Sequence, residues 1–133
     1  AIGIVQLSKL KTILYHKEKL YNFYKKNLLS LNFDVYPKSI NKNSVNWFVT
    51  ITFNKKNLRN KFINYMKSKN VECRPMIFPV SFADHFKKHF KKYEYPNSYN
   101  ISINSVHLPS SIVLNNYQLK KICSFINKWD QTI

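Results

Sequence analysis

The segment from Val45 to Phe53 constrains the fold most, because its side chains alternate between two sides of an extended chain. One side carries Val45, Trp47, Val49, Ile51 and Phe53, and the other carries Asn46, Phe48, Thr50 and Thr52. Such alternation predicts a β-strand with one buried face. Because one strand cannot bury its own face, we expect further strands and a covering layer of helices.

Apolar residues recur at helical spacing on both sides of this strand. In residues 1–31, Leu7, Leu14, Tyr21 and Leu28 lie seven residues apart and share one side of a helix. A second row of apolar residues lies beside them, and Lys17 is its one polar member. This pattern predicts one long amphipathic helix that faces the core. Further helices are expected over residues 57–70 and 81–90 and from residue 115 onward, and residues 96–104 are expected to be helical or irregular. Their start signals are Asn57 as a cap, Ser81 with Asp84, Pro96, and Asn115 with Gln118.

Two shorter strands are expected at residues 33–37 and 71–77. Together these elements predict an α+β fold, in which a small, mostly antiparallel sheet of three or four strands packs against helices beside the long first helix. With 133 residues and 44% hydrophobic content, the chain is expected to form a single domain over residues 1–133.

The chain is strongly basic, with 22 lysine and arginine residues against 6 acidic ones and a net charge of +16. Such a balance raises nucleic acid or an anionic membrane as a partner. The excess is almost wholly lysine, and the lysines are spread in pairs along the expected helices. This distribution is typical of solvated helix faces, so nucleic acid is not the favoured partner.

Gly3 is the one glycine in the chain. Loops that cradle phosphate depend on glycine, so a phosphate-bearing cofactor has to be held mainly by residues outside this chain or by unusual means. Cys73 and Cys123 are too few for a disulfide scaffold, which favours a cytoplasmic setting. No apolar run approaches the roughly 20 residues that span a bilayer, and no signal peptide is recognised, so no membrane partner is expected.

Residues 71–90 combine a short strand, a loop bounded by Pro75 and Pro79, and an expected helix. Arg74 lies where the strand gives way to the loop, and the planar fork of arginine suits a carboxylate or a phosphate. A surface ion pair with Glu72 or Asp84 is the equally weighted alternative. Strand alternation directs Cys73 inward, where it would be inert.

The histidines give weaker signals. His85 and His89 lie four residues apart and could share a metal, but no third ligand is evident, so a solvated helix face is favoured. His107 is expected to be a hydrogen-bonded structural histidine and not a general base. The aromatic residues are expected to fill the core and not to stack on nucleic acid; they are Trp47, Phe53, Phe62, Phe82, Phe86, Phe90 and Trp129.

Three motifs follow one another in the chain. They are AIGIVQLSKL at residues 1–10, NVECRPMIFP at residues 70–79, and the pattern P-x-S-x-x-I-S-x-x-S-V-H-L-P-S at residues 96–110, which is followed by an amphipathic helix. In this order they resemble the C-terminal part of the DegT/StrS-type sugar aminotransferases, which are pyridoxal-phosphate enzymes of the aspartate-aminotransferase fold. The resemblance extends from Ala1 to about Ile126.

The resemblance implies that this chain is the small C-terminal domain of such an enzyme and that the large domain is missing. In the family, the large domain carries the lysine that holds pyridoxal phosphate, the aspartate that pairs with its pyridine nitrogen and most of the phosphate contacts. We therefore expect no catalytic, cofactor-binding or metal residue here, and no transamination by residues 1–133 alone. The complete enzyme is expected to be a homodimer that moves an amino group from an amino acid, typically glutamate, to a nucleotide-linked 4-keto or 3-keto deoxysugar. Perosamine-type amino-sugar and surface polysaccharide biosynthesis use this chemistry.

The resemblance also implies the substrate-binding residues. Arg74, Pro75, Phe78 and Pro79 match an R-P-x-x-x-P segment that borders the substrate cleft in the family. Ser81 stands where many members have a histidine, which is a departure from the family pattern. Two alternatives stay open: a free-standing basic α+β module that binds nucleic acid or an acidic partner, and a domain that associates through its apolar first helix.

Overall fold

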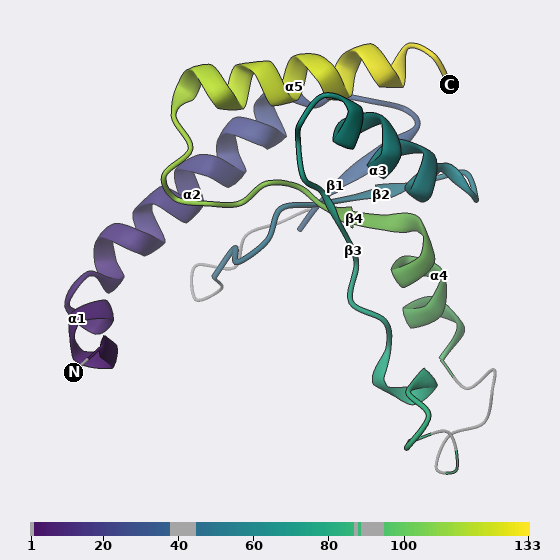
Figure 1. Ribbon diagram of the computed structural model, residues 1–133, viewed down its shortest axis with the longest axis horizontal. Coiled ribbons are helices and arrows are strands. Elements are labelled where there is room, and N and C mark those ends of the chain that lie inside the picture. The colour runs from purple at the N-terminus through teal and green to yellow at the C-terminus, as the bar shows by residue number, and fades with distance from the viewer. Residues whose placement is uncertain (1, 38–44, 87, 89–94) are drawn as a thin grey trace.

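The computed structural model describes residues 2–37, 45–86, 88 and 95–133 (Figure 1). Its helices are α1 (Ile2–Ser8), α2 (Leu10–Asn27), α3 (Leu58–Ser68), α4 (Pro96–Asn104) and α5 (Asn116–Asp130), with a 3-10 turn, η1, at Val80–Phe82. Its strands are β1 (Phe33–Tyr36), β2 (Thr50–Phe53), β3 (Arg74–Pro75) and β4 (Ser105–His107). The strands form one antiparallel sheet in the order β1-β2-β4-β3, which confirms the predicted α+β class.

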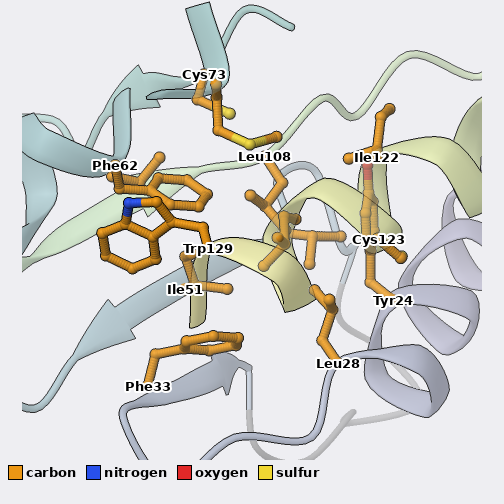
Figure 2. Close-up of a cluster of buried hydrophobic side chains, with 14 of the residues drawn as sticks. Tyr24, Leu28, Phe33, Ile51, Phe62, Cys73, Leu108, Ile122, Cys123 and Trp129 are labelled. Atoms are coloured by element: carbon orange, nitrogen blue, oxygen red, sulfur yellow. The ribbon is translucent and has the colours of Figure 1, made fainter. Parts of the chain in front are cut away.

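The core lies between the sheet and helices α2, α3 and α5. Figure 2 shows Ile51 of β2, Phe62 of α3 and Trp129 of α5 gathered in one cluster. The Phe62 ring centroid lies 5.0 Å from that of Trp129 and 5.4 Å from that of Phe53. The predicted inner face of α5 is confirmed, since Leu119, Ile122, Ile126 and Trp129 are all buried. The capping box of Asn115 and Gln118 is confirmed as well, because each side chain accepts a hydrogen bond from the other residue's backbone N–H.

The single long helix predicted for residues 1–31 is wrong, because two helices meet at Lys9 and the second one ends at Asn27. Lys9 donates its backbone N–H to Gln6 at 3.1 Å, three residues back, which closes α1 with a tighter turn. The predicted core contact holds only for the second half of α2, where Tyr21 and Tyr24 are buried. Figure 1 shows α1 and the start of α2 extending away from the sheet, and Leu7 is 68% exposed there.

The strand predicted at residues 45–53 is shorter, since only Thr50–Phe53 joins the sheet. Trp47 donates its backbone N–H to the carbonyl oxygen of Val45 at 2.9 Å, so the chain turns there instead of extending. Trp47 is consequently 66% exposed and is not the core residue that we predicted, whereas Asn46 is buried.

The segment predicted as a strand at residues 71–77 also shortens, to Arg74–Pro75. Pro75 lacks an N–H group and limits the hydrogen-bonded ladder that β3 can form with β4. Asn57 precedes α3 as predicted, but it adopts φ 66° and its side chain makes no capping hydrogen bond.

The helix predicted at residues 81–90 is replaced, over its described part, by η1 and a series of turns. Ser81 lies inside η1 and does not cap a helix. The expected apolar row is not buried: Phe82 is half-buried between the rings of Phe78 and Tyr99, and Phe86 is exposed. Phe90 and His89 lie outside the described residues.

Candidate functional site

A cavity of about 580 Å³ opens at the edge of the sheet beside β3. Arg74 and His107, which face each other across the β3–β4 ladder, line it together with Phe48. Lys69, which directly follows α3, lines it as well, and α5 contributes Lys121 beside apolar residues such as Ile122. The cavity therefore combines an apolar wall with a rim that carries mostly positive charge.

Arg74 lines this cavity because adjacent side chains of an extended chain point to opposite faces, so Arg74 and Cys73 point in opposite directions. Cys73 points into the core, and burial raises the pKa of its thiol to about 12, which confirms that it is inward and inert. Arg74 points outward, and its Nε donates a hydrogen bond of 3.0 Å to Oε1 of Glu72. The two side chains are 74% and 75% exposed, so the ion pair that we weighed against a ligand role is present and lies in solvent.

His107 is held from two sides. Its Nδ1 lies 2.8 Å from Oγ1 of Thr50, and its ring stacks on that of Phe48 with centroids 4.5 Å apart. Burial lowers the pKa of His107, because desolvation disfavours the imidazolium form. The expectation of a hydrogen-bonded histidine is thus confirmed, and burial favours the neutral form of its ring.

Lys17 links, through hydrogen bonds, the segment that enters β2 and the segment that leaves β4, both of which contribute residues to the cavity lining. Its Nζ donates hydrogen bonds to the backbone carbonyl oxygens of Trp47, at 2.9 Å, and Ser110, at 2.6 Å. The Ser110 hydroxyl in turn accepts a hydrogen bond from the N–H of Val49. Lys17 therefore holds α2 against the segments that enter β2 and leave β4. Its place as the one polar member of an apolar row is the sequence signal for this role.

The other predicted site residues do not line the cavity that contains Arg74. Pro79 and Ser81 line a second hollow of about 470 Å³, next to η1 and α4. Phe78 is half exposed and packs edge-on against Phe82 and Tyr99. Pro75 is exposed on β3. The cavity at β3 instead gains Phe48 and Glu72, neither of which the sequence marked as a ligand contact.

The residues that line the cavity beside β3 do not fit a pyridoxal-phosphate site. Such a site needs a lysine that bonds to the cofactor, a partner for the pyridine nitrogen and a phosphate cradle. The lysines at the cavity rim, Lys69 and Lys121, are exposed and lie over the rings of Tyr65 and Phe125 of their own helices. The cavity carboxylate, Glu72, is paired with Arg74, and Gly3 lies in α1.

Metal-ligating side chains do not gather in groups of three or more within the described residues. His85 lies exposed in a turn. Over the same residues, no helix is both long enough and apolar enough to span a membrane.

Comparison with known proteins relates this chain to sugar aminotransferases. The chain is 29% identical, over 129 residues, to a GDP-perosamine synthase of Escherichia coli O157:H7, and 24% identical, over 131 residues, to a GDP-perosamine synthase of Vibrio cholerae. Each alignment covers 97% of this chain but only 35% and 36% of the relative. The chain thus spans about a third of the length of these relatives.

Solved structures share the fold. A putative sugar aminotransferase from Streptococcus pneumoniae, Spr1654 in its PMP form, superposes with a TM-score of 0.85 at 16% identity. The superposition covers 98% of this chain and 34% of the Spr1654 chain. Helicobacter pylori PseC, an aminotransferase of pseudoaminic acid biosynthesis, gives a TM-score of 0.85 at 15% identity over 98% of this chain and 36% of its own. The model of the DegT/DnrJ/EryC1/StrS aminotransferase family matches residues 1–127. The chain therefore belongs to the DegT/DnrJ/EryC1/StrS aminotransferase family.

Proposed function

We propose that residues 1–133 are the small C-terminal domain of a pyridoxal-phosphate-dependent sugar aminotransferase. The observation that carries this proposal is the family match over residues 1–127, together with two GDP-perosamine synthases that align over 97% of the chain. The proposed reaction transfers an amino group from an amino acid, with glutamate as the donor, to a nucleotide-linked keto-deoxysugar. Pyridoxal phosphate, when bound, supplies the electron sink for this transfer. Because the residues that line the cavity beside β3 do not fit that group, we assign it to a part of the enzyme outside this chain.

The exposed apolar side of α1 and the start of α2 supports a larger assembly. Ile2, Ile4 and Leu7 are each more than half exposed, and together they form an apolar surface of a kind that soluble monomers usually cover. We propose that the rest of the enzyme covers this surface in a cytoplasmic homodimer. On this view, residues 1–133 do not catalyse transamination on their own.

Within the enzyme, we propose that Arg74, Pro75, Phe78, Pro79 and Ser81 border the substrate cleft. Arg74 carries the binding energy in this proposal, because a guanidinium can donate two parallel hydrogen bonds to a carboxylate or a phosphate. Phe78 offers an exposed ring face to the substrate or to the opposing domain. Pro75, Pro79 and Ser81 fix the course of the loop between them.

The activity is tested on the natural gene product that contains this sequence. Borohydride reduction followed by intact mass measurement should show a polypeptide roughly three times as long, as expected for an enzyme of two or more domains, with a covalently fixed pyridoxal phosphate. Incubation with glutamate and a nucleotide-linked keto-deoxysugar should yield the amino sugar. A gene product of 15.9 kDa that carries no adduct would refute the proposal.

The Arg74→Ala variant of that enzyme tests the proposed cleft. Loss of a hydrogen bond to a charged group should cost about 1.5–3 kcal/mol of substrate binding, which is a rise of roughly 10- to 150-fold in the Michaelis constant for the donor or the sugar. Lys19→Ala, at an exposed position of α2, is the matched control and should leave both constants unchanged. Unchanged constants in Arg74→Ala would remove Arg74 from the cleft while leaving the assigned reaction intact.

A further inference from the structure

The carboxylate of Glu72 lies where a ligand of Arg74 would bind. Glu72 and Arg74 are two residues apart on the β3 edge, so their side chains project to the same side. Both line the cavity of about 580 Å³, and the Arg74 Nε to Glu72 Oε1 distance is 3.0 Å. The arginine is thus already engaged with an acid of the same chemical class as the ligands that it suits.

The rest of the cavity favours an anion. Of the described residues that line it, Lys69, Arg74 and Lys121 carry positive charge and Glu72 carries the one carboxylate. Leu108, Ile122 and the ring of Phe48 add apolar surface to the lining of the same cavity. A ligand that matches both parts carries a carboxylate or a phosphate on an apolar or planar body.

The pair that occupies Arg74 is weak enough to be displaced. Both side chains are about three-quarters exposed, and exposed ion pairs contribute only about 0.2–1 kcal/mol. A ligand in the cavity can form the same hydrogen bond to Arg74 while it also contacts the apolar wall. This apolar contact favours displacement of Glu72 by the ligand.

We propose that the cavity beside β3 is a binding site for an organic carboxylate or phosphate, and that Glu72 is an intramolecular competitor which the ligand displaces from Arg74. The inference rests on the proposed ligand role of Arg74 and adds a residue that sets the affinity. Substitution of Glu72 should strengthen anion binding, whereas substitution of Arg74 should weaken it.

The chain offers a direct readout, because Arg59 and Arg74 are its two arginines. In the ¹⁵N-labelled 133-residue chain at pH 6 and 0.15 M salt, the side-chain Nε–H region should contain one signal from each. Arg59 serves as an internal reference, because its Nε donates a hydrogen bond to Oδ1 of Asn60 and its Nη1 donates one to the carbonyl oxygen of Ser102. Titration with phenyl phosphate and with benzoate distinguishes the two anions, and phenol provides the uncharged probe.

We expect at least one of the two anions to shift the Arg74 signal to saturation, with Arg59 and the phenol titration unaffected. Glu72→Gln should lower the Kd about two- to fivefold, as follows from the weak exposed pair. Glu18→Gln on α2 changes the net charge equally and should leave the Kd unchanged. Arg74→Lys, in which binding is followed through the backbone N–H signals of residues that line the cavity, should raise the Kd, because lysine lacks the planar fork.

Three results would overturn the inference in different ways. Equal Kd values for Glu72→Gln and Glu18→Gln would refute the role of Glu72 but leave anion binding by Arg74 in place. A titration in which no anion shifts the Arg74 signal, in the parent chain or in Glu72→Gln, would refute the site itself. Phenol binding as tightly as phenyl phosphate would reduce the cavity to an apolar surface. None of these outcomes touches the assigned reaction, which the borohydride and product assays test separately.

Discussion

Substitution of Lys17 by methionine should destabilise the fold by about 1.5–3 kcal/mol. The change keeps an unbranched apolar stem of nearly the same length but removes the ammonium group, which donates to the carbonyl oxygens of Trp47 at 2.9 Å and Ser110 at 2.6 Å. Each hydrogen bond from a charged donor contributes about 1.5–3 kcal/mol, and both carbonyls would lose their partner. Burial lowers the pKa of Lys17, so desolvation of the charge offsets part of this gain, and we expect about half of the summed range of about 3–6 kcal/mol.

Urea unfolding followed by circular dichroism measures this loss. With an m value of about 1–3 kcal/mol per molar urea for a small domain, the midpoint should fall by roughly 1 M while m stays constant. Lys19→Met is the control, because Lys19 lies on the same helix with an exposed side chain. If the two variants unfold within about 0.5 kcal/mol of each other, the two hydrogen bonds of Lys17 do not stabilise the junction and our reasoning is wrong.

Two further predictions test the core and the buried histidine. Phe62→Ala should lower the free energy of unfolding by about 3–5 kcal/mol, because Phe62 is fully buried against Phe53 and Trp129. The control Phe86→Ala, at an exposed ring, should lower it by less than about 1 kcal/mol. Equal losses in the two variants would contradict the core described here. For His107, whose pKa burial lowers from an ordinary value of 6.5, the unfolded chain binds a proton that the folded chain does not, so stability should fall as the pH drops below about 6.5. Urea unfolding between pH 7.5 and pH 5 should show a steeper loss for the parent chain than for His107→Gln, and parallel curves would refute the assignment of a neutral buried ring.

Local chemistry in the sequence determined several elements of this protein. The burial of Ile51 and Phe53, the helical spacing of α5 and its capping box depend on neighbours within a few residues, and each appears in the structure as predicted. The inward position of Cys73 and the outward position of Arg74 follow from the same two-residue period. The motifs at residues 1–10, 70–79 and 96–110 pointed to the family because each of them is a continuous stretch of sequence.

Tertiary contacts decided the rest. The apolar spacing of residues 1–31 is uniform, but only the second half of α2 lies against the sheet, so periodicity alone could not show where the core ends. Trp47 fits the buried face of a longer strand by alternation, yet a turn at Val45 and the contacts of Phe48 with His107 direct it outward. The cavity at β3 brings Phe48, Arg74 and His107 together from segments far apart in the sequence. Sheet pairing sets that proximity, and pairing depends on long-range packing, which no local pattern specifies.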